Sequence, residues 1–399
     1  MSWKRLVAGF MLAVFLVGPA GGCSRKPERK PVMPLTKIGL SVADATRDGN
    51  VVIRKVMEEK GRAGRVKIIF ANAGGDPLRQ EKDLERLVKK ERVRAVVAQF
   101  VDPATAAGMV RRLKEAGVKV VALDTLVPDA PLDAYVAPDH ARAGELLAQF
   151  VRENLPDGGG APARVLFLSG DPDNPGMEAV AAAFREFFSG YPQVEVLVEN
   201  IPQAEPGAVP PLMEGILVRY GNAVNAVAAA DSRLAVAAIE VLRARGLVDA
   251  VVTAGVGADL RATELLSAGQ HEAEVDVQPE ILGGAALTAA VELVKKGEWR
   301  YETRVPNGDL SVPAQLVPVR LIRPESLYLL TERWQKYGGG GGSGSSSGGA
   351  GKKKNEQGGG SKGAGGGSGK QTRLRITTQD GRTVEVEIPG EIKKIETVQ

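Results

Sequence analysis

The chain has 399 residues, 43% of them hydrophobic and 25% charged, which is the composition of a globular protein with room for two or three domains. Its 52 basic and 48 acidic residues nearly cancel, so the net charge of +4 gives no support for binding nucleic acid. A single cysteine excludes an internal disulfide.

The first residues of the chain predict an export signal. A short basic region precedes a mostly apolar run over 6–17, which is shorter than the roughly 20 residues needed to cross a bilayer. Small residues then lead to Cys23, and this pattern resembles a lipobox, although Ala20 stands where Leu is more frequent. The alternative is an ordinary cleaved signal followed by a free thiol, an unfavourable residue outside the cell. We therefore expect a lipoprotein signal at 1–23, acylation of Cys23 and a tether at 24–35.

From Lys37 onward, short β-rich runs alternate with amphipathic helical patterns. Strands are predicted at 37–43, 66–71, 95–99, 118–123, 164–169, 194–198, 225–230 and 250–255. Helices are predicted at 51–61, 77–91, 103–116 and 232–245, with two more starting at 176 and 259. Near-continuous apolar strands that alternate with helices indicate parallel sheets covered on both faces. One open sheet holds about half of these strands, so the sequence predicts two α/β domains.

The C-terminal part has a different composition. Residues 338–370 are almost wholly Gly, Ser, Lys and Ala, which predicts a flexible linker. An engineered insert is an alternative, but the irregular KKKNEQ within it favours a natural linker. Residues 371–399 contain two alternating runs around Asp380-Gly381, which predicts a small β-hairpin. A hairpin of this size is too small to be stable alone, so we expect it to dock on a partner or to be marginally folded.

Several stretches of sequence, in a fixed order, are similar to a known family. They are KIGLSVAD at 37–44, VVALDTLVPDAPLDAYVAPDHARAGELLA at 120–148, LFLSGDPDNPGMEAVAAAF at 166–184, AVAAADSRLAVAAIEVLRARGL at 226–247, and VTAGVGADLRATELLSAG at 252–269 followed by VDVQPEILGGAA at 275–286. Together they resemble the sugar-binding proteins of ABC importers, in particular the xylose- and ribose-binding group.

The resemblance implies the periplasmic binding protein type I fold. This fold is α/β, with two doubly wound parallel-sheet lobes joined by a three-strand hinge and a solute bound in the cleft between them. Crossings between the lobes are expected near Pro138, Gln278 and Asp309. The expected division is 36–138 and 279–308 for the N-terminal lobe, and 139–278 and 309–337 for the C-terminal lobe. Independently, open α/β sheets bind ligands beyond the carboxyl ends of their strands.

Eight residues near these positions are the candidate ligand-binding residues. A monosaccharide needs charged partners for its hydroxyls and aromatic platforms for its faces. The candidates are Asp44, Gln99, Phe100, Asp124, Asn174, Glu178, Asp231 and Gln278.

The cleft departs from the family pattern at several positions. Asp124 matches the Asp of an Asp-Arg pair, but Thr125 replaces the Arg; Asn50 and Gly49 stand where aromatic and basic residues are usual; Gly257 replaces an Asp. A hydrogen bond to a charged group contributes about 1.5–3 kcal/mol, so losing two or three weakens sugar binding roughly a thousandfold. The sequence therefore predicts a different ligand or none.

Structural alternatives stay open for several candidates. Asp124 either accepts ligand hydroxyls or caps the next turn. Asp231 either contacts ligand or N-caps the helix that begins near Ser232. Phe100 is either a stacking platform or part of the core, and Gln278 serves either the hinge or the ligand. The carboxylates among the candidates, together with Asp48, give the cleft an acidic character that suits a cationic or amine-bearing ligand.

No pattern of an enzyme is found. His140 and His271 lie outside any metal-ligand spacing, and neither a nucleophile elbow nor a phosphate-binding loop is present. We expect no cofactor and no metal. An export signal occupies the place where a related cytoplasmic repressor has its DNA-binding helices.

The sequence predicts an extracytoplasmic, membrane-anchored receptor that captures a small, sugar-like ligand and delivers it to an ABC permease. Closure of the lobes around ligand would create the surface that the permease recognises. The alternative is a sensory or structural module that kept the fold with a degenerate sugar cleft and acts through a protein partner of the hairpin.

Overall fold

The computed structural model describes residues 35–156, 162–220 and 223–338, together with two strands at 371–377 and 383–389. It divides into two compact units, Met1–Gly342 and Ser343–Gln399. The predicted export signal, Cys23, all but the last residue of the tether and nearly all of the predicted linker lie outside the described residues. Within these ranges, no helix is long and apolar enough to cross a membrane.

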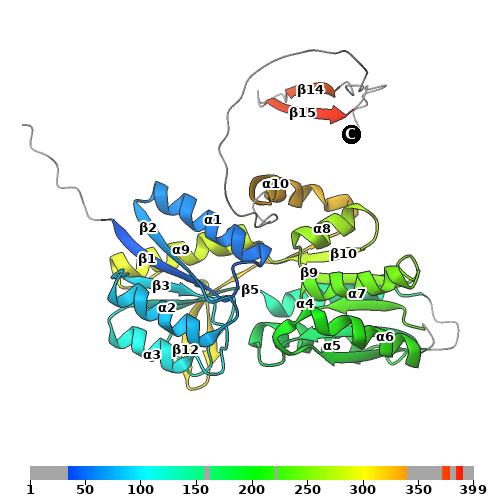
Figure 1. Cartoon of the computed structure of the whole chain (residues 1–399), viewed down its shortest axis with the longest axis horizontal. Coiled ribbons are helices and arrows are strands. Elements are labelled where there is room, and N and C mark those ends of the chain that lie inside the picture. Colours follow the sequence, from blue (N-terminus) through cyan, green and yellow to red (C-terminus); the bar gives the residue numbers. More distant parts are fainter. Residues whose placement is uncertain (1–34, 157–161, 221–222, 339–370, 378–382, 390–399) are drawn as a thin grey trace, which may run out of the picture. The chain divides into compact units, whose positions relative to one another are not determined.

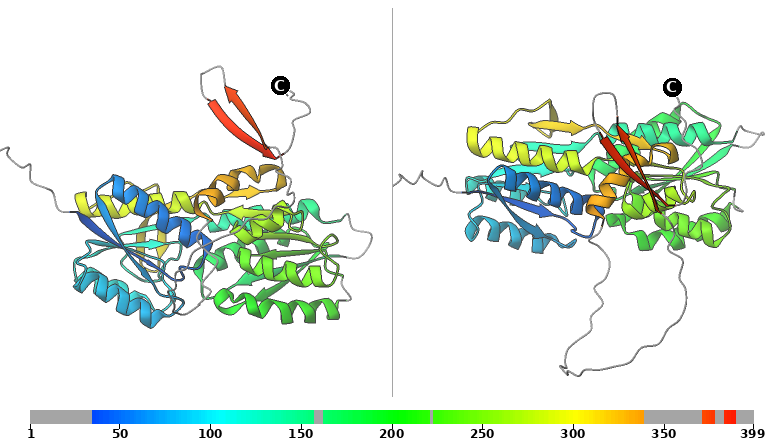
Figure 2. Two further views of the ribbon diagram at one scale, coloured as in Figure 1. Left: turned by 45° about the horizontal axis from the view of Figure 1, so that its top comes forward. Right: turned by 90° about the horizontal axis from the view of Figure 1, so that it is seen from above.

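The first unit contains two sheets, each with helices on both faces (Figures 1 and 2). In spatial order, the first sheet consists of β11 (Thr303–Asn307), β12 (Leu310–Val317), β5 (Ala134–Pro138), β4 (Lys119–Leu123), β3 (Ala95–Ala98), β1 (Thr36–Val42) and β2 (Val66–Asn72). All neighbouring strands are parallel except β11, which is antiparallel to β12.

The second sheet follows the same plan. In spatial order, it consists of β13 (Arg320–Ile322), β10 (Ala273–Asp276), β9 (Val252–Gly257), β8 (Ala226–Ala229), β6 (Ala163–Gly170) and β7 (Val194–Asn200). Only β13 is antiparallel to its neighbour. The prediction of two α/β lobes with mostly parallel sheets is confirmed.

Helices cover both faces of each sheet, so most strands bury side chains on both sides. The first sheet packs against α1 (Asp48–Ala63), α2 (Pro77–Lys89), α3 (Ala107–Glu115) and α9 (Pro279–Lys296). The second sheet packs against α4 (His140–Asn154), α5 (Pro175–Ser189), α6 (Val209–Arg219) and α7 (Ser232–Ala244), and α8 (Leu260–Ser267) lies between β9 and β10 in the chain. In β6, Phe167 packs with α4 and α5, whereas its neighbour Leu166 packs with α6 and α7. This two-sided burial explains the near-continuous apolar runs in the sequence.

The chain passes between the two sheets three times. It leaves the first sheet after Pro138, returns after Val277, and leaves again after Val317. The predicted third crossing near Asp309 is wrong, because Gly308 and Asp309 form the two-residue turn between β11 and β12. Strand β12 then pairs in parallel with β5, so residues 310–317 belong to the first lobe. The Asn-Gly dipeptide that starts this turn is a hairpin signal, and Gly308 takes the positive φ that such a turn needs.

Helix α10 (Tyr328–Tyr337) contacts both lobes. Leu330 packs in a small apolar cluster of the second lobe, Tyr337 packs on α1 of the first, and Trp334 touches both clusters. Its buried Arg333 pairs with Asp276 at the end of β10. The helix therefore joins the two lobes beside the second crossing.

The second unit contains β14 (Gln371–Thr377) and β15 (Thr383–Pro389), which pair in antiparallel register with Leu374 opposite Val386. They form the hairpin that the alternating sequence predicts. Its Asp-Gly turn lies outside the described residues.

Candidate functional site

Two predicted site residues, Gln99 and Asp124, meet at the carboxyl edge of the first sheet. Gln99 follows β3 and Asp124 follows β4, and parallel neighbouring strands end at the same edge. The side-chain Nε2 of Gln99 donates a hydrogen bond of 3.0 Å to Oδ2 of Asp124. The fold therefore brings two of the eight sequence-predicted candidates together.

Asp124 has an unusual backbone conformation that neighbouring groups hold in place. Its φ is +64°, in the left-handed region that aspartate tolerates better than most residues. Its carbonyl oxygen accepts a 3.0 Å hydrogen bond from the hydroxyl of Tyr135. The Nε2 atom of His140 lies 3.3 Å from the same carbonyl oxygen and 3.4 Å from Oδ1 of the Asp124 carboxylate. Such strain is typical of functional sites, where the surrounding structure imposes it.

The pKa values of Asp124 and His140 shift in opposite directions. Burial raises the pKa of the Asp124 carboxyl, but the hydrogen bond and charge of His140, with the Gln99 amide, outweigh burial and hold this pKa below its usual value. Burial lowers the pKa of His140, but the Asp124 carboxylate outweighs it and raises the pKa of the imidazole. Each group thus stabilises the charged form of the other.

Asp231 lies at the carboxyl edge of the second sheet and has charged partners. Its carboxylate accepts a 2.8 Å hydrogen bond from the backbone N–H of Arg233, so it caps α7. Arg233 also reaches both carboxylate oxygens with its guanidinium, at 3.1 Å each. Arg47 of the first lobe adds a contact of 3.3 Å. Asp231 therefore caps α7, as the second alternative predicts, and its carboxylate also forms ion pairs with two arginines.

The two lobes touch beside Asp231. The carboxylate of Asp48, in the first turn of α1, accepts a 2.8 Å hydrogen bond from the backbone N–H of Leu260 at the start of α8. A cavity of 310 Å³ lies here, lined in part by Arg47, Ser232 and Asp259. Burial first, and then the negative charges of Asp231, Asp48 and Glu274, raise the pKa of Asp259 to about 8.

The other polar candidates use their side chains within the protein. Asp44 accepts hydrogen bonds from the backbone and hydroxyl of Thr46, inside the loop after β1. Asn174 accepts from two backbone N–H groups and caps α5. Glu178 forms an ion pair with Arg185, in which both side chains are about half exposed. None of these three contacts the Gln99–Asp124 pair.

Gln278 belongs to the hinge. Its φ is +52°, and it is the last residue before α9, where the chain returns to the first lobe. Its side-chain Nε2 donates to the carbonyl oxygen of Pro318, in the third crossing. Gln278 thus ties two crossings together, which favours the hinge alternative.

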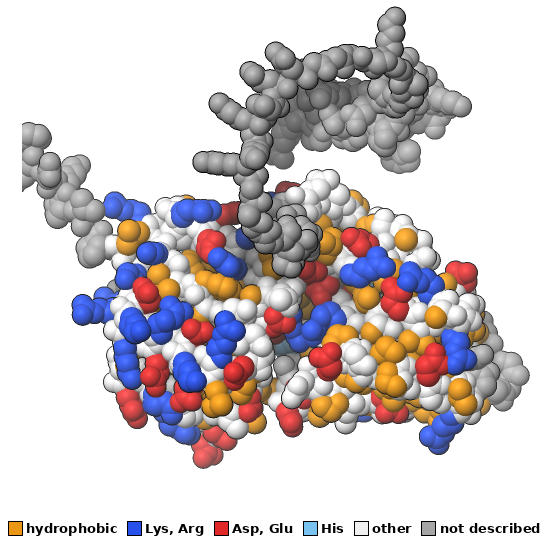
Figure 3. All heavy atoms as spheres, in the orientation of Figure 1, with side chains coloured by type: hydrophobic (Ala, Val, Ile, Leu, Met, Phe, Trp, Pro, Cys, Tyr) orange, Lys and Arg blue, Asp and Glu red, His pale blue; other side chains and the backbone are white. Residues whose placement is uncertain are grey.

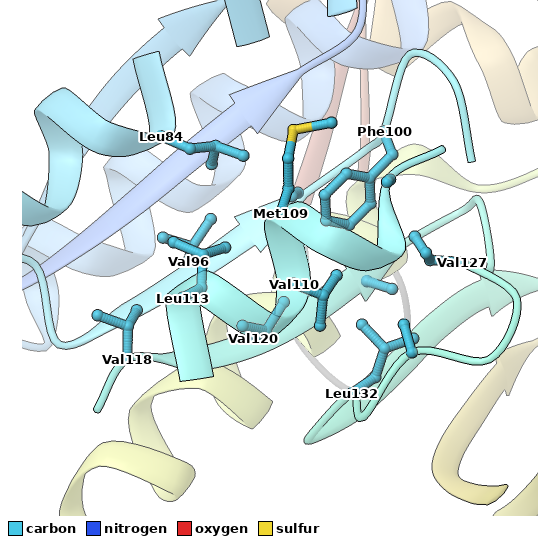
Figure 4. Close-up of a cluster of buried hydrophobic side chains, with 14 of the residues drawn as sticks. Leu84, Val96, Phe100, Met109, Val110, Leu113, Val118, Val120, Val127 and Leu132 are labelled. Atoms are coloured by element: carbon cyan, nitrogen blue, oxygen red, sulfur yellow. The ribbon is translucent and has the colours of Figure 1, made fainter. Parts of the chain in front are cut away.

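The structure places Phe100 in the core, which is the second of the two roles that the sequence leaves open for it. The side chain is 2% exposed and belongs to the cluster that α2 and α3 build on the first sheet. Figure 4 shows its ring beside Met109, above Val110. An apolar residue at a strand end fits either role, and only the packing of α3 over this loop decides between them.

Sequence reasoning missed His140, Asn50 and Arg233. The sequence gives His140 no metal-ligand spacing and no other role, whereas its position just after the first crossing places it at the start of α4, in contact with Asp124. Asn50 donates to Gln99 through a 2.8 Å hydrogen bond. Arg233 follows Asp231 by two residues, a spacing that suits a cap and its own ion pair. In the described part of the chain, no three His, Cys, Asp or Glu side chains gather to hold a metal ion.

The charges around the cleft are mixed. Asp231 is matched by two arginines and Asp124 by His140, so the carboxylates do not form an unpaired acidic surface. Figure 3 shows side chains of both signs along the line where the lobes meet.

The fold and the polar strand ends define a two-lobed α/β binding protein, and comparison with known families agrees. Residues 38–298 match the family described as "Periplasmic binding protein domain", which is more than half of the chain. The chain therefore belongs to the periplasmic binding protein family, and the resemblance predicted from its motifs is confirmed.

Several characterised proteins are similar to most of the chain. The D-xylose-binding periplasmic protein of Escherichia coli is 26% identical over 285 residues, covering 70% of this chain and 84% of that protein. The corresponding protein of Haemophilus influenzae is 29% identical over 290 residues, with the same coverage. The ribose import binding protein RbsB of Bacillus subtilis is 26% identical over 262 residues, covering 64% of this chain and 81% of that protein.

Solved structures share the fold. A myo-inositol binding protein of Caulobacter with bound myo-inositol has a TM-score of 0.66 and 20% identity, covering 77% of this chain and 99% of that chain. A carbohydrate transporter solute-binding protein of Chloroflexus aurantiacus in complex with D-glucose has a TM-score of 0.68 and 15% identity, covering 75% and 96%.

Proposed function

We propose that the protein is a receptor for a neutral sugar or polyol, which it binds between its lobes and delivers to an ABC importer. The observation that carries this proposal is the partly exposed carboxylate of Asp124, held at the edge of the first sheet by Gln99 and His140. An ionised carboxylate with spare acceptor positions is a strong partner for ligand hydroxyls. The similar proteins named above are binding proteins for sugars and for myo-inositol.

The charge balance favours a neutral ligand over the cationic one that the sequence predicted. A cation would need an unpaired carboxylate, whereas Asp231 already faces Arg47 and Arg233. A polyol needs directed acceptors and donors, and both are present where the two lobes meet.

A ligand screen tests the proposal. Thermal unfolding of the full-length chain would be followed with D-xylose, D-ribose, D-glucose, D-allose and myo-inositol, and with spermidine as the cationic probe. A ligand at a hundred times its dissociation constant adds about 2.7 kcal/mol of stability, which gives a clear shift of the melting temperature. Titration calorimetry would then give the affinity. A response to spermidine alone, or to no sugar or polyol, would overturn the proposal.

We further propose that the receptor is extracytoplasmic and anchored through a lipid on Cys23, with a signal at 1–23 and a tether at 24–35. The lipobox-like pattern and the extracytoplasmic setting of this family of import receptors support this. Intact cells would be fractionated after labelling with a fatty-acid analogue. The wild-type chain should carry the label in the membrane fraction, and Cys23→Ala should carry none. Equal labelling of the variant would contradict the lipid anchor.

The C-terminal hairpin is proposed to bind a separate partner. A lone two-stranded sheet is marginally stable in water, which favours a function that includes docking. Deletion of residues 338–399 should leave sugar affinity unchanged and alter localisation or uptake in cells. If localisation and uptake both stay the same, the hairpin has no such partner.

A further inference from the structure

The Asp124 carboxylate is connected to a buried hydrogen-bond relay that starts on α1. The side-chain Nδ2 of Asn50 donates to Oε1 of Gln99 at 2.8 Å, and Nε2 of Gln99 donates to Oδ2 of Asp124 at 3.0 Å. The second N–H of Asn50 donates to the backbone oxygen of Asp44, also at 2.8 Å. Asn50 is 4% exposed and Gln99 8%, so the protein itself supplies the partners of both amides.

The donors fix which way the Gln99 amide points. Its oxygen faces two N–H groups, from Asn50 at 2.8 Å and from the backbone of Ala43 at 3.4 Å. A flipped amide would place its NH₂ against these donors and its oxygen against the Asp124 carboxylate, with repulsion at both ends. Asn50 cannot flip either, because a carbonyl oxygen accepts its other N–H. Each amide of the relay therefore has a single orientation, in which Asn50 donates to Gln99 and Gln99 donates to Asp124.

The backbone at Gln99 is held separately. The fully buried side chain of Gln80, on α2, donates to the carbonyl oxygen of Gln99 at 2.8 Å and accepts from the backbone N–H of Val101 at 3.0 Å. The position of the Gln99 side chain thus depends on α2, and its orientation depends on α1.

From this geometry we infer that Asn50 is a positioning residue for ligand recognition. It orients the Gln99 amide, and through it fixes the Asp124 carboxylate as an acceptor for a ligand hydroxyl. Gln99 is then a positioning residue as well. The inference rests on the proposed function, because it assigns Asp124 to the ligand. This role also gives a physical reason for Asn50 at a position where the family pattern has an aromatic or basic residue.

A double-mutant cycle tests the inference, with the tightest-binding sugar or polyol of the panel above as the probe. Asn50→Ala should weaken binding about tenfold in the wild-type background, because Asp124 loses its oriented donor. In the Asp124→Ala background the same change should have no further effect, since the relay acts only through that carboxylate. A purely structural role would weaken binding in both backgrounds, and that result would overturn the inference.

The matched control is Asn307→Ala. Asn307 is also 4% exposed and also donates two hydrogen bonds to carbonyl oxygens, those of Val127 and Ala130, but it lies at the β11–β12 turn. Its loss should lower stability and leave sugar affinity unchanged. If Asn50→Ala does not fold, Gln99→Met removes the same donor from Asp124 with a side chain of similar length, and should weaken binding to the same extent.

A readout without ligand separates this inference from the proposed function. The pKa of Asp124 can be followed by NMR through the ¹³C shift of its carboxyl carbon. It should rise in Asn50→Ala, because the ionised carboxylate loses a fixed donor, and stay constant in Asn307→Ala. If no sugar or polyol binds the wild-type chain, the proposed function fails and this measurement alone decides the relay. An unchanged Asp124 pKa would overturn the relay even if sugars bind.

Discussion

Each lobe carries an aspartate where a central strand ends, but the two carboxylates have different neighbours. Asp124 of the first lobe is held by the neutral amide of Gln99 and by the ring of His140. Asp231 of the second lobe is held by the guanidinium groups of Arg233 and Arg47, and Arg47 comes from the opposite lobe. The Asp124 carboxylate can still accept hydrogen bonds from a ligand. The Asp231 carboxylate instead caps a helix and pairs with an arginine of the opposite lobe.

This difference shows that a matching residue in a family pattern does not define a role. Both aspartates occupy expected positions in the motifs, and only their three-dimensional neighbours separate a ligand acceptor from an ion-pair partner. The following experiments test this comparison.

The largest expected effect concerns the buried polar side chains that hold the loops next to the two aspartates. In the second lobe, the fully buried Glu274 accepts hydrogen bonds from Ser232 and from the backbone of Ala258, and contacts His271 at 2.9 Å. Glu274→Leu strands all three partners and should lower the free energy of unfolding by about 3–5 kcal/mol in urea denaturation.

The matched change in the first lobe is Gln80→Leu, which removes a fully buried neutral amide. It should cost less, about 1–3 kcal/mol. If both substitutions cost the same, the two lobes do not differ in how their edges are stabilised.

The next effect is on ligand affinity. Asp124→Ala should weaken sugar binding about ten- to a hundredfold in titration calorimetry, because a hydrogen bond to a charged group contributes about 1.5–3 kcal/mol. Asp231→Ala should weaken it less, since Arg47 and Arg233 already use that carboxylate. Equal losses would show that both aspartates contact the ligand.

Another test of this comparison depends on pH. The pKa of Asp259 is raised from 3.8 to about 8, so its protonated form favours the folded state. Its contribution is fully present below the ordinary pKa and is lost as the pH rises from about 4 to about 8, by at most about 1.4 kcal/mol per unit. Asp259→Asn should flatten this part of the stability profile in urea denaturation between pH 4 and pH 8.5. His140, whose pKa is also raised, loses its contribution in the same direction, and that part of the slope should remain.

The smallest effect is expected at the contact between the lobes. Arg47→Ala removes a partly exposed ion pair, which is worth less than about 1 kcal/mol, so sugar affinity should fall by a few fold at most. High salt should remove most of the difference between variant and wild type. A loss that persists at high salt would place Arg47 on the ligand.

Much of the fold follows from local sequence. Apolar runs such as 95–98 and 165–168 are buried on both faces, and this alone predicts parallel sheets covered by helices. The hairpin around Gly308 also had a local signal, the Asn-Gly dipeptide, but the resemblance placed a lobe crossing there instead. The pairing of β12 with β5 joins residues far apart in the chain, and local patterns do not determine it.

The site could be predicted only in part, for a similar reason. Strand ends identified Asp124 and Gln99 as separate candidates, since open α/β sheets bind ligands beyond the carboxyl ends of their strands. The partners that decide their roles come from elsewhere: Asn50 from α1, His140 from α4, and Arg47 from a loop that is 184 residues away from Asp231. Their approach depends on packing and on the lobes meeting, which local sequence does not encode.

Helix α10 gives the lobes a fourth connection, which is not covalent. Rotation of the lobes about the three crossings must separate either Tyr337 from α1 or Leu330 and Trp334 from the second lobe. Exposing one large apolar side chain costs about 1.5–3 kcal/mol, so the contacts of this helix stabilise the arrangement of the lobes seen here by about ten- to a hundredfold. A change in the angle between the lobes therefore requires this helix to repack, in addition to bending of the three crossings.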